Sequence, residues 1–457
     1  MDLFTPTDSR PIHFVGIGGA GMSALALIAR RRGVVVSGCD TDPSGAADVA
    51  ALGARIWQGH DPSHVDGARA VVVTAAVPPG HPELVRARAL GLPVVPRKEA
   101  LAALIGGARS VAVSGTHGKT TTTVMTTEAL TAAGLAPTGI AGGRVSLWGG
   151  NARLAGDDLF VVEADEYDQA FLTLRPTIAI VNNVEPDHLE CYGSMAALED
   201  AFVEFAGRAE TAVVSADDPG ARLIASRLGR GTRSFGLAED ADVRIADVAQ
   251  HADRTEAAVR WRGGRSLRLV LRVPGLHNLR NAVAALTAAD AIGADVVRGA
   301  AALAAFGGVG RRFERLGDHG GVAVVDDYAH HPSELAATLA AARQAYPGRR
   351  LVAVFQPHLY SRTALHGQAM GEALAAADLV VVTEVYAARE QPMDGVSGRH
   401  VAEAARRAGA DARFEATRSE LGRRVYEALA PGDVVLILGA GDITRVGPEL
   451  VRWLDAA

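Results

Sequence analysis

The sequence has little cysteine: of its 457 residues only Cys39 and Cys191 are cysteines, too few for a disulfide framework or a site built from several thiolates. It lacks an uninterrupted apolar stretch of the ~20 residues that cross a bilayer, and its first residues, MDLFTPTDSRPIHF, lack the features of a signal peptide. It has no basic block and a formal net charge of −6, so electrostatic capture of nucleic acid or of an anionic membrane is not expected. These absences predict a soluble cytoplasmic protein with no nucleic-acid or membrane partner.

Small and apolar residues dominate what is present. Hydrophobic residues make up 48% of the chain and aromatic residues only 5%, while glycine occurs 51 times. Small-residue helices and Val-rich strands of this kind are typical of layered α/β proteins. At roughly 150 residues per domain, the length favours about three domains.

Short apolar runs alternate with Ala-rich helical segments along most of the chain. We expect buried parallel strands at 12–17, 34–39, 70–74, 110–114, 159–163, 177–181, 322–326, 351–355, 379–383 and 434–438. Residues 242–273 break this rhythm and predict half-exposed antiparallel strands. The rhythm restarts after glycine-rich segments near 106–108 and 316–321, which predicts domains over 1–107, 108–317 and 318–457.

The first glycine-rich loop, GIGGAGMS at 16–23, follows a predicted strand and opens a helix. Gly16, Gly18 and Gly21 satisfy G-x-G-x-x-G, a pattern that lets the backbone approach a diphosphate. The next predicted strand is followed by Asp40, where a dinucleotide site often places its ribose-binding acid. An NAD site, a site for another diphosphate and a mere tight turn all remain open at this point.

The second glycine-rich loop lies in VAVSGTHGKTTTT. Gly118, Lys119 and Thr120 supply what a nucleoside triphosphate needs: backbone N–H groups around phosphate oxygens, a lysine for the β and γ phosphates, and a hydroxyl for Mg²⁺. The usual first glycine of the P-loop is replaced by Val113, and a tighter loop begins at Gly115. The alternative is a capped helix with a chance lysine.

Acidic residues follow the neighbouring predicted strands. Glu163, Asp165 and Glu166 lie at the carboxyl end of one strand, and Asp187 and His188 follow the next. In open α/β sheets that end faces the ligand crevice, and carboxylates there bind Mg²⁺ directly or through water. These residues are candidate metal ligands, with solvated strand-end charges as the alternative.

Together the motifs resemble those of the Mur ligase family, in the same order and over nearly the whole chain. The carrying segments are GIGGAGMS (16–23), GTHGKTTTT (115–123), EADEYD (163–168), NNVEPDHLE (182–190), PGLHNLRNA (274–282), GRRFE (310–314), DDYAHHPSE (326–334), QPHLYSRT (356–363) and GAGDI (439–443).

The resemblance implies an α/β protein of three domains that forms amide bonds with ATP. The N-terminal Rossmann-like domain would hold UDP, the central P-loop-type domain ATP, and the C-terminal Rossmann-like domain the amino acid. The implied UDP-sugar contacts are Gly16, Gly18, Gly19, Ala20, Gly21, Met22, Ser23, Asp40 and Thr74. The implied ATP contacts are Gly115, Thr116, His117, Gly118, Lys119, Thr120, Thr121, Asn278 and Asn281. The implied metal ligands, for Mg²⁺ or Mn²⁺, are Thr120, Glu163 and His188.

Further residues are assigned roles by the same resemblance. The implied catalytic set is Lys119, Glu163, His188, Asn278, Arg312 and Asp327, and the implied amino-acid contacts are His330, His358 and Arg362. Without the resemblance, Asn278 reads equally well as a helix cap and Arg312 as part of a solvated face.

Two positions depart from patterns within the family. Phe202 stands where several members carry a lysine that becomes a carbamate, and its presence fits the branch that adds L-alanine to UDP-N-acetylmuramate. Leu359 stands where that branch commonly has arginine, which removes one cation from the expected amino-acid pocket.

The implied reaction activates the lactyl carboxylate of UDP-N-acetylmuramate as an acyl phosphate, which the amine of L-alanine then attacks. A ligase that attaches a preformed tripeptide to the same UDP-sugar shares the motif order and is the alternative. An NAD-dependent dehydrogenase is a more remote one, because it leaves Lys119, Glu163 and His188 unexplained. A non-catalytic ATP-binding module is the third.

Overall fold

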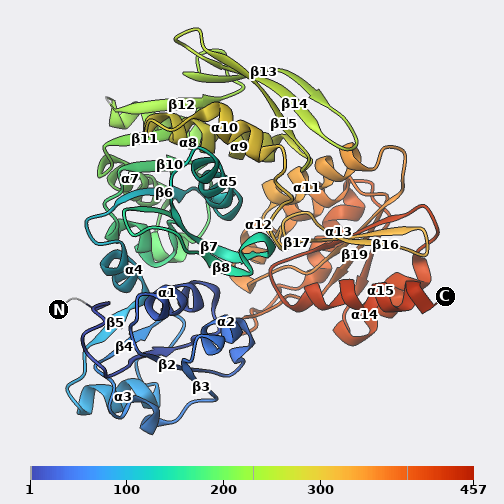
Figure 1. Ribbon diagram of the computed structural model, residues 1–457. Coiled ribbons are helices and arrows are strands. Elements are labelled where there is room, and N and C mark those ends of the chain that lie inside the picture. The colour runs from blue at the N-terminus through green and yellow to red at the C-terminus, as the bar shows by residue number, and fades with distance from the viewer. Residues whose placement is uncertain (1–2, 230, 389, 457) are drawn as a thin grey trace. The chain divides into compact units, whose positions relative to one another are not determined.

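The computed structural model describes residues 3–229, 231–388 and 390–456. They form three β-sheets with helices packed on them (Figure 1). The α/β architecture of three domains expected from the sequence is confirmed. The described chain forms two compact units, one of which holds the residues up to Ala246 together with Val259–Leu267 and Asn281–Leu303. The other holds Asp247–Ala258, Arg268–Arg280 and the residues from Ala304 onward.

The N-terminal sheet has five parallel strands in the order β3-β2-β1-β4-β5. Its strands are β1 (Ile12–Val15), β2 (Val36–Asp40), β3 (Arg55–Gln58), β4 (Ala70–Val73) and β5 (Val94–Pro96). Its helices are α1 (Ala20–Arg31), α2 (Ala47–Ala51), α3 (Pro82–Ala89) and α4 (Arg97–Ile105). Strands β1 and β4 are almost entirely apolar because helices cover both faces of a parallel sheet.

The central sheet has ten strands in the order β15-β14-β13-β12-β11-β10-β6-β9-β7-β8. Its strands are β6 (Arg109–Ser114), β7 (Thr138–Val145), β8 (Gly150–Arg153), β9 (Leu159–Glu163), β10 (Ile178–Val181), β11 (Thr211–Ser215), β12 (Thr232–Gly236), β13 (Val243–Gln250), β14 (Thr255–Trp261) and β15 (Ser266–Leu271). Its helices are α5 (Lys119–Ala132), α6 (Leu189–Tyr192), α7 (Met195–Gly207), α8 (Pro219–Leu228), α9 (Leu276–Ala291) and α10 (Val296–Leu303). Strand β6 pairs in parallel with both β9 and β10, which brings the ends of these three strands together.

The C-terminal sheet has six strands in the order β16-β17-β21-β18-β19-β20, of which only β16 is antiparallel to its neighbour. Its strands are β16 (Glu314–His319), β17 (Val322–Asp327), β18 (Leu351–Phe355), β19 (Leu379–Thr383), β20 (Ala412–Glu415) and β21 (Val434–Leu438). Its helices are α11 (Pro332–Ala345), α12 (Tyr360–Leu374), α13 (Gly398–Arg407), α14 (Arg418–Ala428) and α15 (Val446–Ala456). Apolar clusters fill both faces of this sheet.

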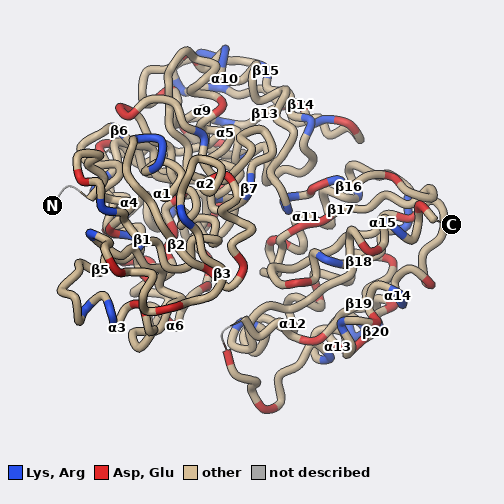
Figure 2. The backbone as a smooth tube through the Cα atoms, turned by 60° about the horizontal axis from the view of Figure 1, so that its bottom comes forward, with Lys and Arg blue, Asp and Glu red and all other residues tan. Residues whose placement is uncertain are grey.

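All ten strands expected from apolar runs are present, within a few residues of the predicted bounds. Residues 242–273 form β13, β14 and β15, which are neighbours at one edge of the central sheet. The alternating burial of β14 agrees with the half-exposed pattern. Figure 2 shows Lys and Arg interspersed with Asp and Glu along the chain.

Candidate active site

The loop between β6 and α5 needs glycine at two positions. Gly115 and Gly118 have φ angles of +132° and +79°, in the region that glycine favours. A Cβ atom on Gly118 would lie 2.6 Å from Oδ1 of Asn281, and one on Gly115 would lie 3.1 Å from the backbone nitrogen of Asn182. The loop is therefore packed tightly beneath the first turn of α5, the arrangement that aims backbone N–H groups at an anion.

Lys119, the first residue of α5, folds back onto this loop. Its Nζ donates hydrogen bonds to the two carboxylate oxygens of Glu166, at 2.8 and 2.7 Å, and to the carbonyl oxygen of Gly115 at 2.8 Å. Burial lowers the pKa of Lys119, but the charges of Glu166, Asp165 and Glu163 outweigh it and raise the pKa above its ordinary value. Lys119 is therefore a buried ammonium group at the phosphate loop.

Glu166, which the sequence suggested as a candidate metal ligand, is the ion-pair partner of Lys119. It is 2% exposed, and burial raises the pKa of its carboxyl, against the charge of Lys119. The hydroxyl of Tyr192 donates to the backbone carbonyl of Glu166 at 2.5 Å. Its position in the EADEYD segment at the end of a strand indicated a site residue. The sequence did not indicate that its carboxylate would form an ion pair with Lys119.

Glu163 ends strand β9 beside the same loop. Its Oε2 accepts hydrogen bonds from the Thr120 hydroxyl at 2.9 Å and from the Gly142 backbone N–H at 2.7 Å. Because Val113 on β6 is in register with Glu163, the pairing of the two strands fixes this contact. A hydroxyl and a carboxylate side by side form a pair of hard oxygen donors, the ligand chemistry that Mg²⁺ prefers.

His188 follows strand β10 in a left-handed conformation, with φ +53°. Its ring contacts Asp187, Glu190 and the edge of Tyr167. Among the residues that the structure describes, no polar contact joins His188 to Glu163. The charge of His188 does reach the lysine–glutamate pair, because it is one of the influences that lower the pKa of Glu166 against the effect of burial.

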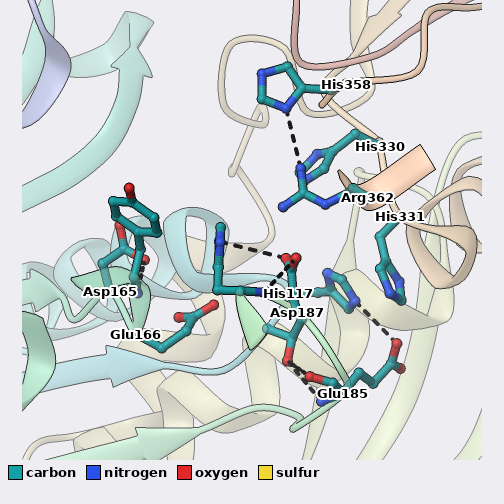
Figure 3. Close-up of polar contacts among 12 residues, drawn as sticks. His117, Asp165, Glu166, Glu185, Asp187, His330, His331, His358 and Arg362 are labelled. Carbon is teal, nitrogen blue, oxygen red and sulfur yellow. Dashed lines mark hydrogen bonds and ion pairs between the residues drawn. The ribbon is translucent and has the colours of Figure 1, made fainter. Parts of the chain in front are cut away.

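The segment after β10 also holds the phosphate loop in place. The His117 backbone N–H donates to the Asn183 side chain at 2.7 Å, and the His117 ring lies 3.3 Å from a carboxylate oxygen of Glu185 (Figure 3). The Thr116 hydroxyl exchanges hydrogen bonds with the backbone of Glu185. Asn183 and Glu185 were quoted within the NNVEPDHLE motif but were not singled out as site residues.

The remaining residues assigned to ATP lie on α5 and α9. Thr121 is buried in the first turn of α5. Asn281 on α9 lies against Gly118, since a Cβ atom on that glycine would be 2.6 Å from Oδ1 of Asn281. Asn278 lies nearly one turn earlier on α9, and its side-chain amide donates to the carbonyl of Pro274 at 2.7 Å. Asn278 is the third residue of α9 and its side chain donates rather than accepts, so it does not act as an N-cap.

In the N-terminal domain, the loop at 16–23 is held by its neighbours. Gly18 donates its backbone N–H to Oδ2 of Asp40 at 2.9 Å, and the Asn151 amide donates to the hydroxyl of Ser23 at 3.0 Å. A Cβ atom on Gly21 would lie 3.0 Å from the guanidinium of Arg97, a cation that the sequence reasoning missed.

The other residues of this loop follow from the same geometry. A Cβ on Gly16, with φ +83°, would lie 3.2 Å from the methyl group of Thr74. Gly19 caps α1, whose first turn contains Ala20 and the buried side chain of Met22. The two carboxylate oxygens of Asp40 accept from the backbone N–H groups of Gly18 and Asp42, so this side chain holds its own loop.

In the C-terminal domain, the structure brings His330, His358 and Arg362 together (Figure 3). Nη1 of Arg362 lies 3.3 Å from Nδ1 of His358, and the rings of His330 and His358 meet edge to face with their centroids 6.1 Å apart. Tyr386, which was not predicted, stacks on His358 at 5.8 Å. Arg362 is 7% exposed, so this cation is largely removed from water.

Asp327 and Arg312 lie side by side in the C-terminal domain but differ in their contacts. Asp327 is buried and accepts hydrogen bonds from the backbone N–H groups of Phe313 and Ala329 at 2.6 and 2.8 Å. Burial raises its pKa to about 6. The Arg312 guanidinium lies over the Tyr328 ring, 5.0 Å from its centroid. Asp327 thus fixes the backbone next to Arg312.

The two departures noted in the sequence are both buried. Phe202 on α7 is fully buried and contacts Phe171 edge to face at 5.1 Å, so this position belongs to the core. Leu359 is 5% exposed and precedes α12 with φ +68°, an unusual conformation for a leucine.

Over the described part of the chain, no helix combines the length and apolar character needed to cross a membrane.

Comparison with known proteins gives a consistent result along the chain. Family models match at residues 11–109 (Mur ligase family, catalytic domain), 113–289 (Mur ligase middle domain) and 311–441 (Mur ligase, glutamate ligase domain). The chain is 44% identical to the UDP-N-acetylmuramate–L-alanine ligase of Cutibacterium acnes over 466 aligned residues, which cover 100% of this chain and 98% of the relative.

Solved structures agree with this match. The crystal structure of UDP-N-acetylmuramate-alanine ligase from Thermotoga maritima is 32% identical, with a TM-score of 0.84 over 98% of this chain and 100% of that one. A murein peptide ligase from Psychrobacter arcticus is 25% identical, with a TM-score of 0.73 over 98% of this chain and 99% of that one. The chain therefore belongs to the Mur ligase family.

Proposed function

We propose that this chain is an ATP-dependent ligase that joins L-alanine to the lactyl carboxylate of UDP-N-acetylmuramate, a step in the synthesis of peptidoglycan precursors. The observation that carries the proposal is the full-length identity of 44% to an L-alanine ligase. Among the solved structures, the alanine ligase matches with a TM-score of 0.84 and the murein peptide ligase from Psychrobacter arcticus with 0.73. The buried lysine at a tight glycine loop supports the use of ATP. All three substrates are small molecules, and we propose the cytoplasm, which supplies ATP and UDP-linked precursors, as the location of the reaction.

Chemically, a carboxylate must gain a good leaving group before an amine attacks it at neutral pH. Transfer of the γ-phosphoryl group of ATP supplies one as an acyl phosphate, and phosphate leaves when the amine of L-alanine attacks. Lys119 would move from Glu166 to the phosphoryl oxygens and neutralise their charge. The loop N–H groups between Gly115 and Gly118 would bind the remaining oxygens.

Thr120, Glu163 and His188 would hold Mg²⁺, with Mn²⁺ as a substitute. The adjacent oxygens of Thr120 and Glu163, 2.9 Å apart, fit a hard divalent cation. When bound, the ion supplies positive charge to the phosphates. Glu163 would then exchange the Thr120 and Gly142 hydrogen bonds for the cation, and His188 would approach it from the end of β10, on the other side of β6 from Glu163.

The substrate contacts are proposed on the residues already described. The loop at 16–23 would hold the diphosphate of UDP, with Arg97 as an added cation. Arg362 would bind the α-carboxylate of L-alanine through its planar fork, oriented by His358 and His330. The roles assigned above to Asn278, Asn281, Arg312 and Asp327 are part of this proposal.

The domain division 1–107, 108–317 and 318–457 is also proposed, and it can be compared with the secondary structure. The first boundary falls between α4 and β6. Strand β16 of the C-terminal sheet starts at Glu314, a few residues ahead of the second boundary.

Phosphate release from ATP tests the proposal. We expect release that requires UDP-N-acetylmuramate, L-alanine and Mg²⁺ together, because each is needed for one turnover. Release that is independent of the amino acid, or binding of NAD with no release, would contradict it. The unmodified chain without the UDP-sugar is the control for simple ATP hydrolysis.

A further inference from the structure

A second group of metal-ligating side chains lies inside the N-terminal domain, and the ligation chemistry does not use it. His13 on β1, Cys39 on β2 and Glu83 on α3 are each fully buried. One donor atom from each lies within 4.8 Å of the other two. Three residues that are far apart in the sequence thus meet at one point on the face of the sheet that α3 covers.

A fourth donor, His60, lies beside two members of this group. Nδ1 of His60 lies 3.2 Å from Sγ of Cys39 and 3.8 Å from Oε1 of Glu83. Nε2 of His13 lies 3.6 Å from the same sulfur and 3.4 Å from Oε2 of Glu83. The His60 side chain is 26% exposed, so it connects the group to solvent and provides a path of entry.

Neighbouring groups hold these donors in the orientation that a metal ion requires. Nδ1 of His13 lies 3.0 Å from the hydroxyl of Ser37, which leaves Nε2 facing Cys39. Oε1 of Glu83 lies 2.9 Å from Nδ1 of His64 and accepts from the backbone N–H of Asp61 at 3.1 Å. A second hydrogen bond that fixes a ligand's ring or carboxylate is the usual outer layer of a metal site.

Three donor separations are close to those around a four-coordinate ion. Zinc–sulfur and zinc–nitrogen bonds of about 2.3 and 2.1 Å place the donors of a tetrahedral site roughly 3.3 to 3.7 Å apart. Nε2 of His13 lies 3.6 Å from Sγ of Cys39 and 3.4 Å from Oε2 of Glu83, and Nδ1 of His60 lies 3.2 Å from the same sulfur. His60 faces the other carboxylate oxygen of Glu83, Oε1, so it is the ligand that would move on binding. The Cys39 sulfur lies closer, 2.9 Å, to Oε2 of Glu83, and this contact is the one that would lengthen.

We propose that His13, Cys39, His60 and Glu83 bind one Zn²⁺ ion as a structural site. Thiolate and imidazole donors select zinc over Mg²⁺, so this site is chemically distinct from the one at Glu163. On binding, the Cys39 thiol loses its proton to solvent and the sulfur bonds to the ion. The thiolate and the carboxylate together cancel the charge of Zn²⁺, so a neutral unit is buried in the apolar cluster around Val15, Val71 and Leu84.

The position of Cys39 gives the ion a structural role. The carbonyl oxygen of Cys39 accepts the backbone N–H groups of Gly16 and Ile17, the first residues of the diphosphate loop. The next residue, Asp40, holds Gly18. An ion bound at Cys39 would tie β1, β2 and α3 to the base of this loop.

Cobalt substitution tests the proposal on the full-length protein. The chain is treated with a chelator, supplied with excess Mg²⁺ to fill the ATP site, and titrated with Co²⁺. We expect one Co²⁺ per chain with a thiolate-to-cobalt charge-transfer band in the near ultraviolet, and displacement of that band by Zn²⁺. The band should persist in Cys191→Ser, the matched control, and disappear in Cys39→Ser.

If Cys39→Ser fails to fold, a variant of another proposed ligand, His60, gives a second measurement. His60→Gln keeps the thiol and alters a partly exposed residue, and we expect it to weaken Zn²⁺ binding by at least ~10-fold. The absence of a charge-transfer band in the unaltered chain would overturn the proposal and leave the group as a hydrogen-bonded network. A band lost in Cys191→Ser and kept in Cys39→Ser would overturn it as well.

Discussion

Lys119 and Glu166 form a buried ion pair, so in the proposed reaction the binding of phosphate at this loop would exchange one anion for another. The lysine is already desolvated and charged, and its carboxylate partner lies on a separate segment of the chain. An incoming phosphoryl group would need only to replace Glu166, because the positive charge is already in place. Glu166 compensates the charge of the buried lysine.

Removing that cation should abolish ligation. In Lys119→Met, the transition state loses a charge contact worth about 3 kcal/mol or more, so phosphate release should fall at least ~100-fold. The measurement is kcat for phosphate release with all three substrates, alongside circular dichroism to establish folding. The control is Lys98→Met, which removes the partly exposed ion pair between Lys98 and Asp168. Near-normal turnover in Lys119→Met would show that the loop does not bind ATP.

Glu163 offers a separate test of the metal site. In Glu163→Gln, the carboxylate charge beside Thr120 is lost while the size of the side chain is kept. We expect the Mg²⁺ concentration for half-maximal phosphate release to rise at least ~10-fold, since one ligand charge is missing. Glu210→Gln, at an exposed position ahead of β11, should leave the Mg²⁺ titration unchanged. Identical titrations in Glu163→Gln and the unaltered chain would contradict the assignment.

At the scale of the element, the strand–loop–helix units account for what could be predicted. The strands were recognised because runs such as those in β6, β10 and β18 are Val- and Ile-rich and buried on both faces. Their carboxyl ends come together because neighbouring parallel strands share a sheet edge, so Lys119, Glu163 and His188 could be expected in one region.

Other elements carried no such signal. Strand β7 (TGIAGGRV) is glycine-rich and β16 (ERLGDH) is polar, so neither resembles a buried strand. The contact between Lys119 and Glu166 depends on the turn after β9, where Asp168 and Gln169 adopt positive φ angles that no local pattern indicated. Arg97 lies against Gly21 only because the start of α4 packs near the start of α1.

Alanine substitutions at Gly118 and Gly134 distinguish the effect of backbone strain from the effect of a steric clash, because both glycines have positive φ but only Gly118 is closely packed. Gly118→Ala should place a methyl group 2.6 Å from Asn281 in addition to straining a φ of +79°, whereas Gly134→Ala strains a φ of +90° with open space around it. We expect Gly134→Ala to lower the free energy of unfolding by about 1 kcal/mol and to leave the KM for ATP unchanged. Gly118→Ala should cost more and should raise the KM for ATP at least tenfold. Equal effects on KM would contradict the packing of Asn281 on this loop.

The segment from β16 to β17 should respond to pH through Asp327. Its pKa of about 6 lies above the ordinary value of 3.8, so between these values the folded chain keeps a proton that the unfolded chain has lost. Stability should therefore fall as the pH rises from about 4 to about 6, by up to about 3 kcal/mol from this group, and then level off. Urea unfolding of the chain and of Asp327→Asn at several pH values measures the difference. Parallel curves for the two proteins would contradict the burial of an ionisable Asp327.

For the whole molecule, the order of nine motifs carried the family assignment, and the three matching segments agree with it. The order of the motifs does not distinguish the alanine-adding ligase from the tripeptide ligase, because both would share the nucleotide sites. In the proposed function, the distinction depends on the surroundings of Arg362, where Leu359 is buried and His358 stacks on Tyr386. Arg362 would pair with the α-carboxylate of L-alanine, and the side chains around it would exclude a bulkier acceptor.

A competition between acceptors distinguishes an alanine ligase from a peptide ligase. Equal concentrations of L-alanine, glycine, L-serine and a tripeptide that begins L-Ala-D-Glu are supplied with ATP and UDP-N-acetylmuramate, and the UDP-linked products are quantified by mass spectrometry. We predict that the L-alanine adduct dominates, with glycine incorporated roughly 10- to 200-fold less well because one methyl group is worth about 1–3 kcal/mol. Predominance of the tripeptide adduct would contradict the account and identify the chain as a peptide ligase.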